Sequence, residues 1–458
     1  MSKMQFDSLA NEFQEIFRAL NLPYENFDYR IEVVYDSVYI TLIYGEIYSN
    51  NYKLISIMSD LIIKRTIKRL AKRDLYRLLS RIHNIKLPYG SLTGVRPTKL
   101  FYDLNDEFSD AEAILIDEFD VSEEKARLIS RVITGQKGIY NVDTNKVDLF
   151  INIPFCASRC AYCSFISAEI GKNADLLDKY VENLSIDITK ALILLNQKQK
   201  KIRSVYVGGG TPTSLSDKHF AKLLNLISNT AQEMTVEAGR PDSITRGKLD
   251  IMKECGVSRI SINPQTFSDK TLKLIGRNHN TESIYMTFEA AREYYFDINM
   301  DLIAMLPEEG LEDFVYSVNE AVRLRPENIT IHTLALKKGS KLKYEEYDNT
   351  RGEMAEQMIN YADKKLSESA YLPYYMYRQK YMSGNLENTG YTLYGKQCVY
   401  NIDIMEETHS IVACGAGGIS KFVVGDRIER AANVKDIKVY LERFDEMMSR
   451  RERLFENL

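Results

Sequence analysis

The stretch FINIPFCASRCAYCSF, residues 150–165, decides how the rest of the chain is interpreted. It brings Cys156, Cys160 and Cys163 close together, and these are half of the 6 cysteines in a chain of 458 residues. A disulfide would leave one thiol over, and a structural zinc site would need a fourth ligand. The spacing therefore indicates a ligand that three thiolates can bind.

The composition is that of a soluble globular protein, with 45% hydrophobic and 27% charged residues. A formal net charge of -4 predicts no general affinity for nucleic acid or anionic membranes. The start MSKMQFDSLANEFQEIF lacks the apolar segment of a signal peptide, and no run is long enough to span a bilayer. We therefore expect a cytoplasmic protein without a membrane span, whose clustered cysteines are metal ligands or redox groups. The scattered Cys255, Cys398 and Cys414 are expected to be small buried hydrophobes.

Residues 1–145 have the pattern of a separate α+β domain. Helical stretches at 7–20, 54–82, 109–119 and 122–135 accompany two predicted strands within 29–48. The helix at 54–82 carries a basic run that we interpret as a solvated face rather than an RNA-binding face. The run comprises Lys64, Arg65, Lys68, Arg69, Lys72, Arg73 and Arg77.

From Lys146 the pattern changes to strands that alternate with helices, which predicts parallel pairing and a partial barrel over 146–370. The tail, 371–458, is rich in Tyr and Gly and is expected to cover the substrate with loops and short strands before a helix at 435–455. The expected barrel strands are 146–153, 202–209, 233–239, 257–263, 296–306 and 327–336.

The cysteines directly follow the first of these strands, at the end of a barrel that carries chemistry. Three thiolates from one loop can bind an iron–sulfur cluster and leave one iron open for another ligand. A zinc site completed by a distant Cys or His, and chance clustering, are the alternatives. The motif YVGGGTPTSL, 206–215, ends the second strand with glycines that let the backbone approach a ligand closely.

CASRCAYC together with GGGTPT resembles the radical S-adenosylmethionine (SAM) superfamily. The motifs INIPFC, VEAGRPDSIT, RISINPQTF, IGRNHN and DLIAMLP, in this order, resemble the oxygen-independent coproporphyrinogen III oxidase family. The stretch LTGVRPTKL and the Tyr-rich tail look most like its auxiliary coproporphyrinogen dehydrogenase branch, which has an extra N-terminal domain. The resemblance implies an α/β fold, a partial (β/α)6 radical SAM barrel with an N-terminal α+β domain and a C-terminal extension.

The resemblance also implies two cofactors, a [4Fe–4S] cluster and SAM. It assigns Cys156, Cys160 and Cys163 to the cluster. It assigns to cofactor binding Phe150, Tyr162, Gly210, Thr211, Glu237, Gln265, Arg277 and Asp301.

Several positions depart from the related pattern. Phe150 stands in place of a Tyr, Asn152 in place of a His, and Phe165 in place of a further Cys. EAGRPD and NPQTF replace the usual ENPD and GVQSF. SAM cleavage is expected to survive these changes, whereas the oxidative decarboxylation is the step that they affect.

The implied activity converts two propionates of coproporphyrinogen III into vinyl groups, giving protoporphyrinogen IX. It needs a tetrapyrrole substrate and a low-potential electron donor such as flavodoxin or ferredoxin, and nucleic acid is not an expected partner. Arg378, Lys380 and Lys396 are candidate partners for the propionates. The rival function is a haem-binding chaperone on the same scaffold, with His332 and His409 as candidate axial ligands; tRNA modification has the least support.

Overall fold

The computed structural model describes residues 9–54, 60–93, 96–107, 109–163, 168–335, 340, 342, 352–379, 382–424 and 427–456. Phe165 and Lys380 lie outside these ranges. The chain forms two compact units, Met1–Ser130 with Arg378–Lys380, and Arg131–Tyr377 with Tyr381–Leu458. We call them the N-terminal unit and the barrel unit. The three-part division expected from the sequence, with limits at 145 and 370, stays a prediction.

The N-terminal unit is built around an antiparallel sheet of three strands, β1 (Asp28–Val34), β2 (Ser37–Tyr44) and β3 (Glu46–Lys53). Val38, Ile40 and Leu42 alternate along β2 and are fully buried in this unit's core, so one face of the sheet is covered. The two expected strands are present as β1 and β2, and the third strand was not predicted. Gly45, at φ +66°, turns β2 directly into β3, whose sequence EIYSNNYK is too polar to be recognised as a strand.

Helices make up the rest of this unit. They are α1 (Ala10–Ala19), α2 (Asp60–His83), α3 (Pro97–Glu107), α4 (Ala111–Phe119) and α5 (Glu123–Gly135). The last turn of α5 belongs to the barrel unit, where Arg131 Nη1 donates to Asp363 Oδ2 at 2.8 Å.

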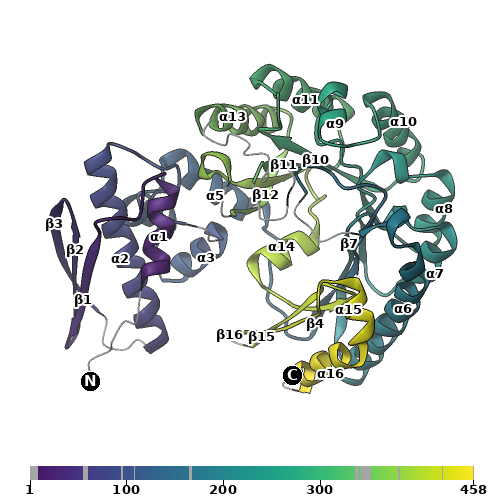
Figure 1. Ribbon diagram of the computed structural model, residues 1–458, viewed down its shortest axis with the longest axis horizontal. Helices are drawn as coiled ribbons and strands as arrows, with labels where there is room; N and C mark the ends of the chain where they lie inside the picture. The colour runs from purple at the N-terminus through teal and green to yellow at the C-terminus, as the bar shows by residue number, and fades with distance from the viewer. Residues whose placement is uncertain are drawn as a thin grey trace. The chain divides into compact units, whose positions relative to one another are not determined.

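The barrel unit confirms the predicted fold. Six parallel strands stand side by side in chain order, with each connecting segment containing at least one helix. Helices α6 to α11 run along the outside of the curved sheet (Figure 1). The strands are β4 (Lys146–Ile153), β7 (Lys201–Gly209), β8 (Glu233–Val236), β9 (Arg259–Ser261), β10 (Asp297–Ala304) and β11 (Asn328–Thr333). The helices are α6 (Ala174–Gln197), α7 (Asp217–Ile227), α8 (Arg246–Glu254), α9 (Asp269–Leu274), α10 (Thr281–Arg292), α11 (Leu311–Leu324) and α13 (Gly352–Glu368).

The tail extends this sheet at both edges. On the β11 side lie β13 (Asn388–Thr392) and β12 (Leu372–Tyr377), and on the β4 side lie β14 (Ser410–Cys414), β15 (Ile419–Val424) and β16 (Arg427–Ala432). Strand β14 pairs with β4 in parallel, with Ser410 opposite Val147. The helix expected at 435–455 is two helices, α15 (Ile437–Glu442) and α16 (Phe444–Glu456). The substrate-covering role of the tail stays a prediction.

Side chains fill the inside of the curved sheet. Alternation along β4 sends Leu149, Ile151 and Ile153 into the core shared with the outer helices, and leaves Phe150 and Asn152 on the inner side. Helix α14 (Val399–Glu406) lies within the ring of strands in Figure 1. Its Tyr400 packs in one cluster with Phe150 of β4. Helix α14 therefore fills the inside of the curved sheet. The groups that are open to a ligand lie at the carboxyl ends of the strands.

Candidate functional site

The cysteine loop follows β4 at the carboxyl end of the sheet. Cys156 ends the short strand β5 (Phe155–Cys156), which pairs with β6 (Ala168–Glu169). The loop is docked by its backbone, because the N–H of Ala161 donates to the carbonyl of Ile275 at 3.0 Å. All six cysteines are free thiols. As expected, Cys255, Cys398 and Cys414 are buried.

The glycine motif joins the second strand to this loop. The N–H of Gly210 donates to the carbonyl of Ile153 at 2.8 Å, and that of Thr211 to the carbonyl of Phe155 at 2.7 Å. The Thr211 hydroxyl lies 3.5 Å from the Cys156 sulfur. The two segments predicted to bind cofactor are thus in direct contact, and Thr211 is the residue that links them.

Glu237, which directly follows β8, is held in a fixed position. The Tyr206 hydroxyl donates to its Oε1 at 2.7 Å, and the N–H of Gly209 donates to its Oε2 at 3.1 Å. A Cβ on Gly208 would lie 2.7 Å from Oε2, so a larger residue there would have to displace the carboxylate. Burial raises the pKa of Glu237, while the two hydrogen bonds act to lower it. Tyr206 was not predicted, although it lies two residues before Gly208 on the same side of the strand.

Arg277 brings a buried cation to the cysteine loop. Its Nη1 donates to the carbonyls of Asn263 (2.7 Å) and Gly239 (3.3 Å), and its Nη2 donates to the Tyr162 hydroxyl (3.0 Å). Burial acts to lower the pKa of Arg277, but Tyr162 and the Cys160 thiol raise it above its ordinary value. Arg277 is 8% exposed, forms no ion pair with a carboxylate in the described part of the chain, and its Nε has no hydrogen-bond partner there.

Arg240, from the unusual segment EAGRPD, also holds the loop. Its Nη1 donates to the hydroxyl and the carbonyl of Ser158 at 2.8 and 3.2 Å. Its Nε and Nη2 donate to the two oxygens of Asp242 at 3.0 and 2.9 Å. Sequence reasoning noted the altered motif but did not assign Arg240 a contact with the cysteine loop.

Asp301 lies within β10, and Gln265, which follows β9, pairs with the neighbouring Leu302. The carbonyl of Asp301 accepts from the N–H of Gln265 at 2.9 Å, and Gln265 has φ +70°, a strained value for a residue with a side chain. The Asp301 carboxylate accepts from Asn299 Nδ2 at 2.8 Å and faces His332 Nε2 at 3.5 Å. Burial acts to raise the pKa of Asp301, but His332 and neighbouring hydrogen bonds lower it below its ordinary value.

The two altered positions on β4 are used for packing within the protein. The Phe150 ring stacks on Tyr400, with centroids 6.2 Å apart. The Asn152 side-chain amide donates to the carbonyl of Ala416, and the backbone carbonyl of Asn152 accepts from the Tyr180 hydroxyl at 2.8 Å. Phe150 was expected to bind cofactor, and its contacts in this structure are with aromatic side chains.

Two candidate propionate partners, Arg378 and Lys396, bond to other parts of the protein. Arg378 donates to the carbonyl of Leu92 and covers the Tyr89 ring at 4.1 Å, within the N-terminal unit. Lys396 donates to Asp297, the first residue of β10 and hence at the opposite end of the sheet. The position of Lys396 argues against it as a propionate partner at this site.

His409 lies just before β14, also at the opposite end of the sheet. It is fully buried beside Asp403 and Asp148, with one ligand-type atom of each residue within 4.8 Å of the others. Arg203 donates to Asp403 at 2.7 Å and balances part of this charge. His409 is therefore wrongly placed for an axial haem ligand at the strand ends, whereas His332 lies among the site residues.

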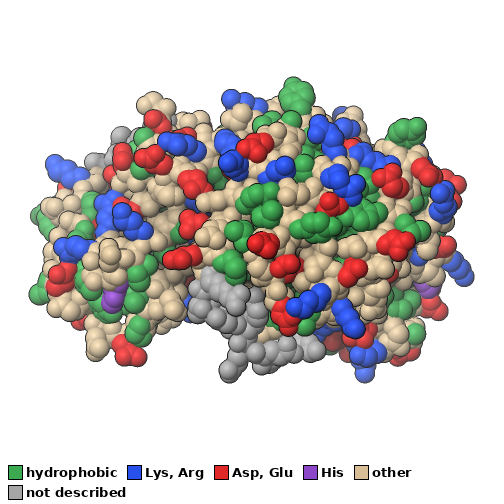
Figure 2. Space-filling model, turned by 90° about the horizontal axis from the view of Figure 1, so that it is seen from above, with side chains coloured by type: hydrophobic (Ala, Val, Ile, Leu, Met, Phe, Trp, Pro, Cys, Tyr) green, Lys and Arg blue, Asp and Glu red, His purple; other side chains and the backbone are tan. Residues whose placement is uncertain are grey.

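The basic run of α2 is largely paired inside the N-terminal unit. Lys68 forms an ion pair with Glu12, Lys72 with Glu15, Arg73 with Glu118, and Arg77 with Asp120. On the face in Figure 2, acidic and basic side chains are interspersed. The ion pairs favour the solvated helix face over an RNA-binding face.

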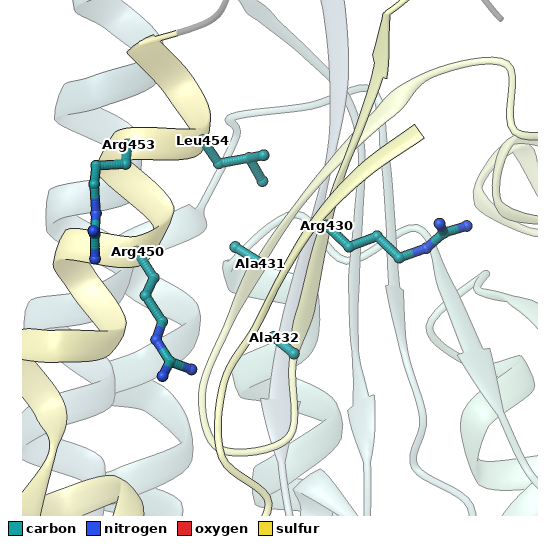
Figure 3. Close-up of a pocket in the computed structure, with 6 residues that line it drawn as sticks. All are labelled: Arg430, Ala431, Ala432, Arg450, Arg453 and Leu454. Atoms are coloured by element: carbon teal, nitrogen blue, oxygen red, sulfur yellow. The ribbon is translucent and has the colours of Figure 1, made fainter. Parts of the chain in front are cut away.

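A surface pocket lies between β16 and α16. Arg430 and two alanines line it from β16, and Arg450 and Arg453 extend from α16 (Figure 3). Arg430 pairs with Glu407, and Arg450 pairs with Glu446. None of the predicted site residues lines this pocket.

No helix in the described ranges is long and apolar enough to cross a membrane.

A curved sheet of six parallel strands, with three cysteines on the loop after the first, defines the radical SAM class. The model of the radical SAM superfamily matches residues 151–321. More narrowly, the chain belongs to the family of oxygen-independent coproporphyrinogen-III oxidase-like proteins. It is 38% identical over 401 residues to HemZ of Bacillus subtilis (strain 168), a match that covers 83% of this chain and 80% of HemZ.

Two other relatives frame the question of function. The heme chaperone HemW of Escherichia coli (strain K12) is 26% identical over 307 residues, which cover 65% of this chain and 76% of HemW. The solved structure of coproporphyrinogen III oxidase (HemN) from Escherichia coli matches with a TM-score of 0.54 at 21% identity, covering 71% of this chain and 73% of that chain. The structural match shows a shared fold.

The cofactors of this chain are therefore a [4Fe–4S] cluster and SAM. The residues at the strand ends fit both groups. Three free thiols on one loop suit iron, and the buried guanidinium of Arg277 lacks a carboxylate partner among the described residues. Glu237 and Asp301 are partly buried carboxylates that suit the positive charge of a sulfonium or ammonium group.

Proposed function

We propose that this protein catalyses a SAM-dependent oxidative decarboxylation of propionate side chains on a tetrapyrrole, with coproporphyrinogen III as the substrate and protoporphyrinogen IX as the product. Each round removes CO₂ and one hydrogen atom from a propionate, and passes one electron to an acceptor. Two observations carry the proposal: the Glu237 carboxylate is held by Tyr206 and Gly209, and Arg277 is bonded to Tyr162 of the cysteine loop. They support an intact SAM-cleaving half of the site.

In this proposal Cys156, Cys160 and Cys163 hold the cluster. When bound, the cluster and SAM supply one-electron chemistry that can remove a hydrogen atom from an unactivated carbon. Arg277 neutralises negative charge next to Cys160, and Glu237 orients the cationic ligand. Tyr206 positions Glu237. Together with α14, against which it packs, Tyr206 excludes water from the side of the site that faces the inside of the sheet.

The substrate side of the proposal rests on His332 and Tyr377. The Tyr377 hydroxyl lies 3.4 Å from His332 Nδ1, and His332 is about one quarter exposed at the end of β11. A ring N–H of His332 and the Tyr377 phenol can donate hydrogen bonds to a propionate carboxylate. Because Phe150 and Asn152 are occupied by protein contacts, these two groups are our candidates for the polar contacts on the substrate side.

The test is an anaerobic assay of the reconstituted protein with SAM, dithionite and coproporphyrinogen III. We expect both 5′-deoxyadenosine and protoporphyrin. The control is the triple variant in which Cys156, Cys160 and Cys163 are changed to alanine, which should form neither product and hold no cluster iron. A wild-type protein with a full cluster that cleaves SAM but leaves coproporphyrinogen III unchanged would contradict the proposal.

A haem chaperone is the second candidate, favoured by one specific observation. Phe150 and Asn152 stand in place of the Tyr and the His of the related oxidase motif, and both are engaged in packing. Such a protein would bind haem tightly, with His332 as the axial ligand at the strand ends. Haem titration of the wild type and of His332→Ala separates the two functions. Tight binding that is lost in the variant, without decarboxylation by the wild type, would favour the chaperone.

A further inference from the structure

Asn263 lies just beyond β9, between the strand ends that carry Glu237 and Asp301. Ile260 and Ile262 are fully buried in the core shared with the outer helices. Because side chains alternate along a strand, Asn263 is on the inner side of the curved sheet. The related motif GVQSF has a glycine at this position, so the Asn263 carboxamide is an added polar group.

The backbone around Asn263 is fixed on both sides. Its carbonyl accepts from Arg277 Nη1 at 2.7 Å. Pro264 follows and restricts the chain. The next residue, Gln265, is held in its strained conformation by hydrogen bonds to β10, in which its N–H donates to Asp301 and its carbonyl accepts from Ile303, both at 2.9 Å. The carboxamide therefore cannot easily leave the strand ends.

The side-chain oxygen of Asn263 is buried and has no hydrogen-bond partner among the described residues. Arg277 Nε, on the residue bonded to the Asn263 carbonyl, is likewise without a partner there. Unpaired buried polar atoms are unfavourable, and their occurrence on two residues in contact indicates a ligand that supplies both an acceptor and a donor.

We infer that Asn263 Oδ1 accepts a hydrogen bond from bound SAM, next to the acceptor that SAM offers to Arg277. The inference rests on the proposed binding of SAM at these strand ends. The donor is an N–H or O–H of SAM, from its amino group or from a ribose hydroxyl. Asn263 is thus a SAM-binding residue that the related glycine-containing motif does not provide.

The experiment measures SAM binding by anaerobic equilibrium dialysis to the reconstituted full-length protein. We expect Asn263→Ala and Asn263→Gly to weaken SAM binding by about 2- to 10-fold, the range for one hydrogen bond, with unchanged iron content. The matched control is Asn225→Ala, an exposed asparagine of α7, which should bind SAM as the wild type does. Equal SAM affinity of the wild type and both Asn263 variants would overturn the inference alone.

A second ligand identifies the donor. 5′-Deoxyadenosine contains the ribose but no amino acid part, so a ribose donor predicts that both variants weaken its binding as well. An amino-group donor predicts that only SAM binding is weakened. If the wild type itself fails to bind SAM while it holds its cluster, the proposed function and this inference fall together.

Discussion

Removing the Tyr206 hydroxyl is the most direct test of how the site holds Glu237. In Tyr206→Phe the carboxylate loses the donor at 2.7 Å and keeps the N–H of Gly209 at 3.1 Å. A hydrogen bond to a charged group contributes about 1.5–3 kcal/mol, which corresponds to roughly a ten- to hundredfold change in affinity. Because the Gly209 donor is kept, we expect a loss of SAM affinity at the lower end, about tenfold.

The pH dependence gives a second measure of the same change. Burial already raises the pKa of Glu237, and the Tyr206 hydrogen bond acts to lower it. SAM binding needs the ionised carboxylate, so affinity should fall as the pH drops through this pKa. Without the hydroxyl the pKa rises further, and the fall in affinity should begin at a higher pH in Tyr206→Phe than in the wild type.

The assay is anaerobic SAM titration across this pH range, with cluster absorbance recorded in parallel. Tyr400→Phe is the matched control, because its ring stacks on Tyr206 with centroids 4.5 Å apart while the hydrogen bond to Glu237 is retained. Wild-type SAM affinity and an unshifted pH profile in Tyr206→Phe, at full cluster content, would refute the positioning role of Tyr206.

Three further changes probe the site and the fold. Gly208→Ala should displace the Glu237 carboxylate and weaken SAM binding at least tenfold, as measured by the same titration; unchanged binding would count against the fixed carboxylate. Arg240→Ala should release the cysteine loop and speed iron loss to a chelator several-fold, with partial rescue by Arg240→Lys; equal rates would contradict the loop contact. Arg451→Ala leaves Asp187 buried without its cation and should lower the free energy of unfolding by about 3–5 kcal/mol, seen as a lower urea midpoint; an unchanged midpoint would exclude a stabilising role.

The barrel was predictable because each strand–helix repeat carries its own local sequence pattern. The stretch KVDLFINI predicts a strand at 146–153, and the structure has β4 at Lys146–Ile153. The cysteine and glycine motifs could likewise be placed at strand ends from the order of elements alone. Their contact through Thr211 and Cys156 follows from the neighbouring positions of β4 and β7.

The errors arise where a structure depends on distant partners. Pairing of β14 with β4 joins Ser410 to Val147, and no local pattern in either segment specifies the other. The third strand of the N-terminal unit is polar, so its assignment depends on pairing with β2. Arg240 and Asn263 were seen only as departures from a motif, because their contacts involve segments far away in the sequence.

The pairing of β4 with β14 also has a consequence for biosynthesis. Strand β4 precedes the cysteine loop and needs β14 to complete its hydrogen bonds on one side. A ribosome that has translated the cysteines still has to translate most of the barrel before residues 410–414 emerge. This edge of β4 therefore stays unpaired until residues 410–414 have emerged, and we expect iron–sulfur delivery to follow that point.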